Sequence, residues 1–550
     1  MISFDTTVDT DFPVYSRAHT AVVLPGVVSP LAWTLLGPAL ETAHRITFCR
    51  RFGLMPWPRY KEFLFVGRFG GRLYQNVTVL EAIAVRGPGS SPVSAELGLE
   101  GTDVSRYQAR WTDRLWTVNS LSRGALAVVR LRAWTREGVQ RVEALRSGTD
   151  RVLARADPAE IAGLLEQLRA DLPSSLALNG TVRSLEMAAV ATVQQLLERR
   201  GVEPEIAAAL LSGLPGLEGA QPSLRLRALA HWVASTPDVL AAIASGATYA
   251  ELRAATSPGI KSFLERFLAF QADFGHRGID EADPTAPAWE QQPDVVLGMI
   301  RGLLAAPERD PLVGLEQRRA GAERIVRGLP LRHRLPVLTT ARIARGLIAR
   351  AEITKSVLIR HVHQLRRCLW ALRDPIGSQV DAASFTLLTW DELSRIVAGV
   401  APPSSDELSR RRLELDGAAA LDPPLVFDGV FRSTVADLAG VTDMLVGVGA
   451  APGAASGPAV VVLEPTDPPP PGSVLVAPAT DTAWTPLFLA AAAVVTDLGS
   501  FMSHSSIVAR ELGIAAVVNT GTATRTIRSG QPTRVDGDRG LVFLGGGATG

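Results

Sequence analysis

A histidine among small hydroxyl residues has the clearest chemical potential in this sequence. His504 follows Ser503 and precedes Ser505 and Ser506, and the helix predicted to begin here would end at Gly513. A neutral imidazole is nucleophilic near pH 7, and the free N–H groups at a helix N-terminus favour an anion placed there. These residue types in this order indicate phosphate chemistry through a phosphohistidine.

The elements around His504 are predicted to build a compact β/α domain. The apolar run from Leu487 to Val495 is too short for a membrane span and indicates a buried strand, which a Gly-containing turn connects to the His504 helix. Further short strands are expected on both sides, within residues 449–462, 472–478, 516–519 and 533–544.

The stretch TDLGSFMSHSSIVARELGIAAVV, residues 496–518, resembles the signature of the swivelling phosphohistidine domain of phosphoenolpyruvate-utilising enzymes. That family includes phosphoenolpyruvate synthase, pyruvate phosphate dikinase and rifampin phosphotransferase. In the family pattern T-x-G-G-x-x-S-H-x-A-I-x-A-R-E-x-G-I-P-A-V-V, the histidine carries phosphate on Nε2, and His504 stands at this position. Ser500 replaces the usual second glycine, and Ala515 replaces the usual proline. A buried structural histidine is the alternative interpretation of His504.

The resemblance also implies roles for neighbouring residues. Ser503 is predicted to orient His504, and four residues are predicted to support the phosphate site: Thr496, Gly499, Ser505 and Arg510. For Arg510 and Glu511, a salt bridge on the helix is the alternative.

Three upstream segments, in their order, resemble the acceptor-binding region of rifampin phosphotransferase-like proteins: residues 24–33, 71–76 and 275–283. In the third segment, Arg277 is the candidate phosphate clamp, because a guanidinium matches phosphate oxygens. His276 or Glu281 is the candidate base for the acceptor hydroxyl. A helix-ending turn with a surface charge cluster is the alternative.

The predicted fold class is multidomain α+β. Residues 1–135 are expected to be a mixed α/β part and 136–425 a mainly helical part of the acceptor-binding region, followed by a linker at 426–445 and the swivelling domain at 446–550. Helices are expected near 157–168, 187–199, 223–234, 314–326 and 354–372.

Composition excludes several classes of function. A net charge of +1 gives no electrostatic case for nucleic acid or an anionic membrane surface. The sequence predicts no signal peptide and no membrane helix, so we expect a cytoplasmic protein. Two cysteines provide neither a disulfide framework nor a thiolate metal cluster. His361 and His363 lie two apart in a predicted helix and make a poor metal pair, so no metal site is expected.

The functional hypothesis is a phosphotransferase component. No Gly-rich phosphate loop with an attached lysine is evident, so we expect no bound cofactor. A separate ATP-grasp partner would hold ATP and Mg²⁺ and phosphorylate His504, and a PEP-type donor is the alternative. The phosphoryl group would then pass to a hydroxyl of a small-molecule acceptor. One alternative is a condensing or dehydrating enzyme of secondary metabolism, or a phenylphosphate synthase-like subunit, on the same scaffold. The other is a non-catalytic carrier or regulatory protein.

Overall fold

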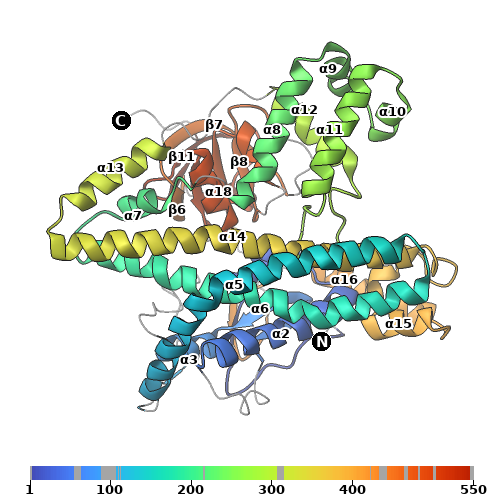
Figure 1. The fold of residues 1–550 in the computed structure, drawn as a ribbon, viewed down its shortest axis with the longest axis horizontal. Helices are drawn as coiled ribbons and strands as arrows, with labels where there is room; N and C mark the ends of the chain where they lie inside the picture. Colours follow the sequence, from blue (N-terminus) through green and yellow to red (C-terminus); the bar gives the residue numbers. More distant parts are fainter. Residues whose placement is uncertain are drawn as a thin grey trace. The chain divides into compact units, whose positions relative to one another are not determined.

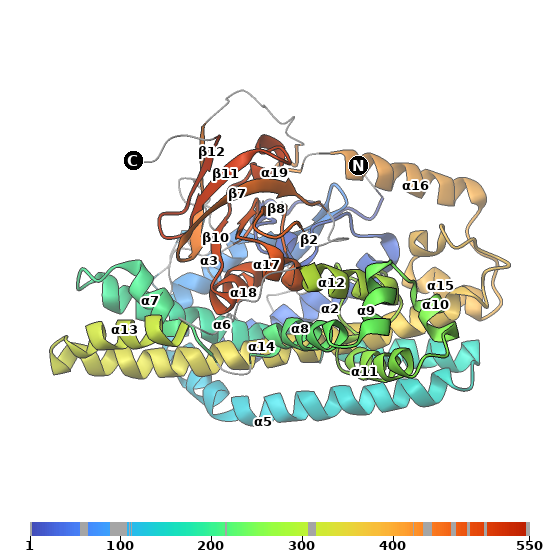
Figure 2. The ribbon, with the colours of Figure 1, turned by 90° about the horizontal axis from the view of Figure 1, so that it is seen from above.

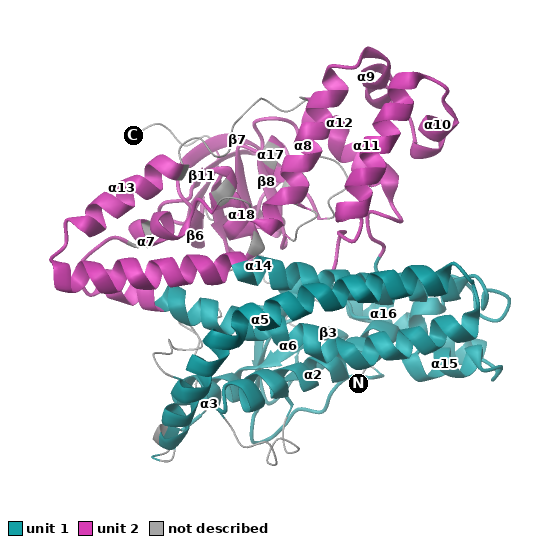
Figure 3. Ribbon diagram, viewed as in Figure 1, with its two compact units in different colours: residues 1–191, 282–286, 350–437 teal, residues 192–281, 287–349, 438–550 magenta. Residues whose placement is uncertain are grey.

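The computed structural model divides the chain into two compact units (Figure 3). Unit 1 comprises residues 1–191, 282–286 and 350–437, and unit 2 comprises residues 192–281, 287–349 and 438–550. The structure describes residues 3–54, 64–87, 107–108, 111, 113–214, 217–305, 315–421, 423–432, 443–463, 469–480, 484–499 and 503–545.

Unit 1 contains a four-stranded antiparallel sheet in the order β2-β3-β1-β4. Its strands are β1 (Val14–Ser16), β2 (Val66–Phe69), β3 (Arg72–Asn76) and β4 (Val426–Asp428). β4 lies more than 400 residues after β1 in the sequence, and Val14 is paired with Asp428. An aromatic cluster of Tyr15, Phe69, Tyr74 and Phe427 covers one face, so residues from both ends of the unit stabilise this sheet.

Helices make up most of the remainder of unit 1. Its shorter elements are α1 (Thr20–Val23), α2 (Pro30–His44), the π-helix η1 (Arg45–Arg51), α3 (Val77–Arg86), η4 (Phe385–Leu387), α15 (Trp390–Val397) and α16 (Ser405–Ala420). Of these, α1, α2 and α3 pack against the sheet. Three helices of more than 40 residues run side by side (Figures 1 and 2): α5 (Asp113–Leu153), α6 (Pro158–Glu198) and α14 (Leu331–Arg373). The division between the units falls within α6 and α14.

A buried ion cluster joins α6 to α14. Arg183 contacts Glu186 at 2.9 Å and Glu352 at 2.8 Å, and both carboxylates are almost completely buried. Burial lowers the pKa of Arg183, but the attraction of the two carboxylates outweighs it and raises that pKa. The guanidinium therefore stays charged and holds the two long helices together close to the division.

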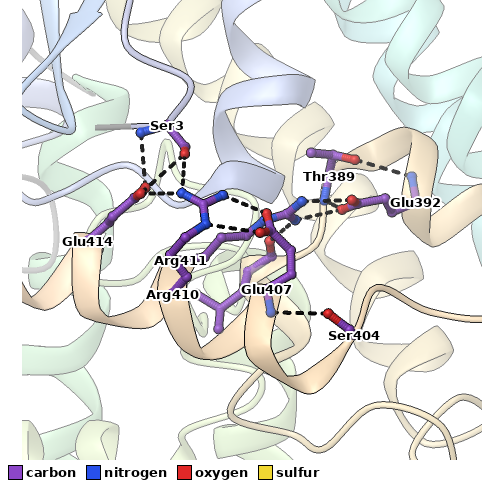
Figure 4. A network of polar contacts seen from close by, with 9 residues as sticks. Ser3, Thr389, Glu392, Ser404, Glu407, Arg410, Arg411 and Glu414 are labelled. Atoms are coloured by element: carbon purple, nitrogen blue, oxygen red, sulfur yellow. Dashed lines mark hydrogen bonds and ion pairs between the residues drawn. The ribbon is translucent and has the colours of Figure 1, made fainter. Parts of the chain in front are cut away.

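A second polar network fixes the start of the described chain to α16 (Figure 4). The Ser3 backbone N–H donates to Glu414, while Arg410 contacts Glu414, Glu407 and Ser3 at the exposed side of the helix. On the buried side, Arg411 donates from both terminal nitrogens to Glu392, at 2.7 and 2.8 Å. Because Glu392 also caps the N-terminus of α15, Arg411 connects α15 to α16.

Unit 2 combines a helical cluster with a large sheet. The described helices before the sheet are α7 (Pro204–Leu211), η3 (Glu218–Ala220), α8 (Gln221–Ala234), α9 (Pro237–Ala244), α10 (Tyr249–Ala254), α11 (Pro258–Phe274), α12 (Pro293–Ala305) and α13 (Leu315–Arg327). Phe263, Phe267, Phe270 and Phe274 recur at helical spacing on α11 and are buried with Trp289.

The sheet of unit 2 has eight strands in the order β5-β12-β11-β7-β8-β9-β10-β6. The strands are β5 (Met444–Val446), β6 (Val448–Ala451), β7 (Ala454–Val461), β8 (Val474–Ala477), β9 (Ala493–Thr496), β10 (Ala515–Val518), β11 (Pro532–Asp536) and β12 (Leu541–Leu544). β7, β8, β9 and β10 are parallel to their neighbours within this group, and the outer pairs are antiparallel. Three helices belong to it: α17 (Thr485–Ala490), α18 (His504–Leu512) and α19 (Ala523–Thr526).

Alternate residues of the parallel strands enter two different cores. Leu475, Val494 and Ala516 pack on the side of α17 and α18, in the same hydrophobic cluster as α8, α11 and α12. Val474 and Val495 enter a second cluster that contains α19 and the antiparallel strands. Figure 2 shows α17 and α18 on one side of these strands. A sheet buried on both faces explains why these strands are almost purely apolar.

The predicted fold class is confirmed: mixed α/β elements are followed by a mainly helical middle part and a C-terminal β/α part. One prediction within it was wrong. Leu487 to Ala490 belong to helix α17, and the strand starts only at Ala493. Pro486 in the first turn favours a helix start. Because the helix and the strand are both buried, the run is apolar throughout and shows no periodicity that would distinguish a helix from a strand.

The long helices were also predicted as shorter pieces. Residues 157–168 and 187–199 fall almost entirely within α6, which continues through Pro173, and 354–372 lies within α14. The predicted domain boundaries stay predictions, and residues 433–442 of the predicted linker lie outside the described residues. None of the helices in the described ranges combines the length and apolar character needed to cross a membrane.

The neighbours Arg411 and Arg410 provide a test of the α15–α16 connection. We expect Arg411→Met to lower the free energy of unfolding by about 2 kcal/mol, because Glu392 and the Leu387 carbonyl lose a largely buried donor. Arg410→Met is the control and should cost much less, since Arg410 lies in solvent. Urea unfolding measures both; equal losses would contradict the assignment.

The contact between Arg411 and Glu392 also predicts that the stability of the chain depends on pH. Burial raises the pKa of Glu392, but hydrogen bonds from Arg411 and Thr389 outweigh it and hold that pKa below the usual value. A lowered carboxylate pKa contributes stability above the pKa of the unfolded state, and this contribution is lost as the pH falls through the folded-state pKa. The difference between wild type and Arg411→Met should therefore shrink on acidification below about pH 4.

Candidate phosphohistidine site

The site is built where a parallel strand leads into a helix. β9 ends at Thr496, Ser503 is the N-cap residue of α18, and His504 is its first residue. The helix ends at Gly513, whose φ of 64° is the left-handed conformation expected at a helix C-terminus. The sequence therefore placed His504 and both ends of this helix correctly. The His504 side chain itself lies outside the described residues.

Three buried hydroxyls lie around the start of α18. The Ser503 Oγ is 2.9 Å from the Ser505 Oγ and 3.0 Å from the Ser506 Oγ. Ser503 makes no side-chain cap bond to the helix backbone, although serine often makes one at this position. The Ser503 hydroxyl contacts the two neighbouring serine hydroxyls instead of the helix backbone. The positive end of the helix dipole at His504 therefore suits an anionic group.

The loop before α18 depends on Thr496 and Gly499. The Thr496 Oγ1 donates to the Leu498 carbonyl across the turn, 2.8 Å away. Gly499 has a φ of 154°, and a Cβ at this position would lie 2.9 Å from the Val518 Cβ and 3.3 Å from the Ser503 Oγ. Only a glycine lets the loop pass this close to both β10 and the N-cap residue. Thr496 and Gly499 thus fix the course of the chain directly after β9, and their predicted role at a phosphate site stays a prediction.

Asp497 is a residue of this loop that was not singled out from the sequence. Its buried carboxylate accepts hydrogen bonds from the Thr524 backbone N–H, at 3.0 Å, and from the Thr524 hydroxyl. Burial raises the pKa of Asp497 despite these hydrogen bonds. The carboxylate ties the loop to α19. The signal available in the sequence was an ionisable residue between an apolar strand and a glycine turn.

Arg510 lies in the same helix but is turned toward the sheet. Its side chain is buried, and Nη1 donates to the Ala450 carbonyl of β6 at 2.7 Å. This contact fixes α18 to the edge of the sheet. Its predicted phosphate role stays a prediction, and the side chain of Glu511 lies outside the described residues.

The predicted acceptor segment lies between α11 and α12. Gly275 ends α11, and the chain doubles back so that the Trp289 N–H donates to the Arg277 carbonyl, at 2.7 Å, and the Glu290 N–H to the Gly275 carbonyl. Arg277 and Glu281 form an ion pair at 3.1 Å, and His276 is buried next to them. The segment is a helix-ending turn, as the alternative interpretation held. However, its charges are buried rather than at the surface.

Apolar neighbours of both groups of predicted site residues belong to one hydrophobic cluster. Ile279, between Arg277 and Glu281, packs against the cluster that contains Val508 and Ala509 of α18. α18 also packs against η3, and α17 against α8 and α12. Within the part of the chain that the structure describes, no three His, Cys, Asp or Glu side chains are grouped as a metal site requires.

The described elements thus define a multidomain α+β protein in which a β/α domain with a helix starting at a histidine packs on a helical domain. Residues 180–357 match the family described as the rifampicin phosphotransferase fourth domain, and residues 469–540 match the mobile domain of PEP-utilising enzymes. The resemblance predicted from the sequence is therefore confirmed.

Three relatives illustrate the extent of the similarity. The prodigiosin synthesizing transferase of Serratia marcescens is 30% identical over 310 residues, which cover 52% of this chain and 34% of the relative. The rifampicin phosphotransferase of Streptomyces sviceus is 30% identical over 305 residues, covering 52% and 35%. An uncharacterised protein of Mycobacterium tuberculosis is 29% identical over 579 residues, covering 98% of this chain and 62% of that protein. The chain thus matches less than two thirds of the length of each.

The loop before α18 provides a second test. We expect Gly499→Ala to destabilise the chain by about 1–3 kcal/mol, because the new methyl group would overlap the Val518 side chain in a conformation that alanine avoids. Gly521→Ala is the matched control, since Gly521 also has a positive φ, of 74°, but open space at its Cβ. Denaturant unfolding should show the larger loss for Gly499→Ala; an equal or smaller loss would refute this view of the loop.

Proposed function

We propose that this chain is a phosphotransferase component that carries a phosphoryl group on His504 and delivers it to a hydroxyl of a small-molecule acceptor. One observation carries the proposal: His504 is the first residue of a helix in a domain that matches the PEP-utilising mobile domain, and the N-cap hydroxyl makes no cap bond to that helix. Both features favour a negatively charged phosphoryl group on this histidine.

In the first step, the neutral imidazole Nε2 attacks a phosphorus atom of ATP, which an ATP-grasp partner would hold with Mg²⁺. A P–N bond forms, the bond from that phosphorus to its bridging oxygen breaks, and the rest of the nucleotide leaves with the electron pair. The dipole of α18 stabilises the dianionic phosphoryl group. The ATP-grasp donor rests on the family resemblance, in which such a domain phosphorylates this histidine.

In the second step, the acceptor hydroxyl oxygen attacks the phosphorus of phospho-His504. The P–N bond breaks, its electron pair returns to the imidazole, and a base takes the hydroxyl proton. We propose the segment at 275–283 as the acceptor side, with Arg277 as the phosphate clamp and His276 or Glu281 as the base. Its support is the hydrophobic cluster that Ile279 shares with α18. Arg277 is paired with Glu281, so binding of phosphate would require the guanidinium to share its donors.

A second candidate function uses the same first step. The similarity to the prodigiosin synthesizing transferase covers as much of this chain as the similarity to the rifampicin phosphotransferase. In a condensing enzyme, phosphorylation would activate an oxygen as a leaving group, and a second substrate would displace phosphate. The two functions differ in the product: a stable phosphate ester for the phosphotransferase, and free phosphate with a new bond between two substrates for the condensing enzyme.

Phosphorylation of His504 tests the proposal. The full chain, mixed with ATP, Mg²⁺ and an ATP-grasp protein or isolated ATP-grasp domain of a rifampicin phosphotransferase, should gain the mass of one phosphate that is stable in base and lost in acid. His504→Ala should abolish the gain. His231→Ala, which removes an exposed histidine of α8, should retain it. Intact-mass spectrometry at alkaline pH provides the measurement, and a phosphate that persists in His504→Ala would sink the proposal.

The acceptor side has its own test, with rifampicin as the probe acceptor. Arg277→Lys should still be phosphorylated on His504 but should transfer the phosphoryl group about tenfold more slowly, because lysine lacks the planar fork of donors. The matched control is Arg266→Lys on α11, whose guanidinium lies over Trp232. Single-turnover transfer from the phosphorylated chain separates the steps. If Arg277→Lys slowed phosphorylation of His504 and transfer to rifampicin equally, Arg277 would only maintain the fold.

A further inference from the structure

A polar cavity of about 180 Å³ lies in unit 1, and none of the residues assigned so far lines it. Its walls come from the end of the π-helix η1 and from the long helices α5 and α6. The polar and aromatic residues that line it are Arg51, Trp134, Glu137, Arg141, Ser174 and Ser175. Two arginine side chains line this cavity, and the charge of the largely buried one, Arg51, is costly unless an anion compensates it.

Arg51 is held in place by several contacts. Its Nη1 donates to the Ala177 carbonyl and to the Thr181 hydroxyl, each at 2.8 Å, and its guanidinium lies 4.6 Å from the centre of the Trp134 ring. Both hydrogen bonds to described residues use Nη1, which leaves Nε and Nη2 for the cavity. Among the described residues, no carboxylate lies within ion-pair distance of Arg51.

The electrostatic environment of Arg51 is unfavourable to its own charge. Burial, and then the positive charge of Arg141, lower the pKa of Arg51 to about 10. Arg141 is itself only loosely compensated, because its nearest carboxylate, on Asp171, lies 3.7 Å away and both side chains are partly exposed. An anion between the two guanidinium groups would relieve this repulsion.

The two serines add donor and acceptor capacity. The pKa of His361 is lowered by burial, so its ring is neutral, and its Nε2 lies 2.9 Å from the Leu168 carbonyl. The carbonyl can only accept, so Nε2 carries the proton and Nδ1 accepts from the Ser175 hydroxyl at 2.9 Å. Ser175 therefore offers lone pairs to the cavity, whereas Ser174 makes no side-chain hydrogen bond to a described residue and can donate.

From these contacts we propose that the cavity binds a small oxyanion, a carboxylate or a phosphate, between Arg51 and Arg141, with Ser174 as a further donor. The cavity is smaller than the roughly 300–1,000 Å³ typical of drug-sized ligands, so it suits a small acid or an inorganic anion. The π-helix that ends at Arg51 is a rare form of backbone that occurs often at functional sites. Glu137 is the carboxylate among the lining residues and opposes the anion. The proposal does not depend on phosphorylation of His504.

Calorimetric titration of the full chain tests the site, with benzoate as the carboxylate probe and inorganic phosphate as the second probe. We expect saturable binding of at least one probe that weakens as salt is raised. Arg141→Gln should weaken it about tenfold or more, which corresponds to the loss of one charge-assisted contact. Arg141 is partly exposed, so this variant should fold normally, whereas Arg51→Gln also removes two hydrogen bonds to α6.

Two further variants make the outcome decisive. Glu137→Gln should tighten binding several-fold, the opposite of Arg141→Gln, because it removes the repelling carboxylate. His504→Ala should leave binding unchanged. Binding of benzoate alone would identify a carboxylate site, and binding of phosphate alone a phosphate site. The absence of saturable binding of both probes, equal affinity in Arg141→Gln, or loss of binding in His504→Ala would each overturn the proposal.

Discussion

The structure of unit 2 depends on one hydrophobic cluster that is shared by two kinds of domain. Alternate residues of β8, β9 and β10 face α17 and α18, and the same cluster continues into α8, α11 and α12. Because interiors are closely packed, this contact sets the position and tilt of α18, and with it the backbone at His504. The antiparallel strands and α19 bury the other face, so the parallel strands have little freedom to shift.

The chemistry that we propose rests on this support. A histidine at the start of a helix can carry a phosphoryl group only if the helix N-terminus is held in place. The loop before the helix must also pass close to the neighbouring strand and to the N-cap residue. Gly499 provides the close approach, Thr496 and Asp497 fix the start of the loop, and Arg510 fixes the helix to β6. Unit 1 contains the Arg51–Arg141 cavity, where burial and the charge of Arg141 lower the pKa of Arg51.

Much of the site could be predicted from the sequence, because its signals are local. The helix from His504 to Gly513 follows from capping chemistry, and the parallel strands follow from short apolar runs. Two features could not be predicted in this way. The Leu487–Val495 run divides into a helix and a strand because burial on all sides removes the period that distinguishes them. The cavity is lined by Arg51, Trp134 and Ser174, which come from three different helices. No local sequence pattern shows that these helices pack together.

Intact-mass spectrometry of the full chain after incubation with ATP, Mg²⁺ and an ATP-grasp protein tests the central claim most directly. The account predicts a single acid-labile, base-stable phosphate that is present in wild type and in His231→Ala and absent in His504→Ala. Two results would contradict it: no phosphate on the wild-type chain although the donor is active on its own substrate, or a phosphate that His504→Ala retains.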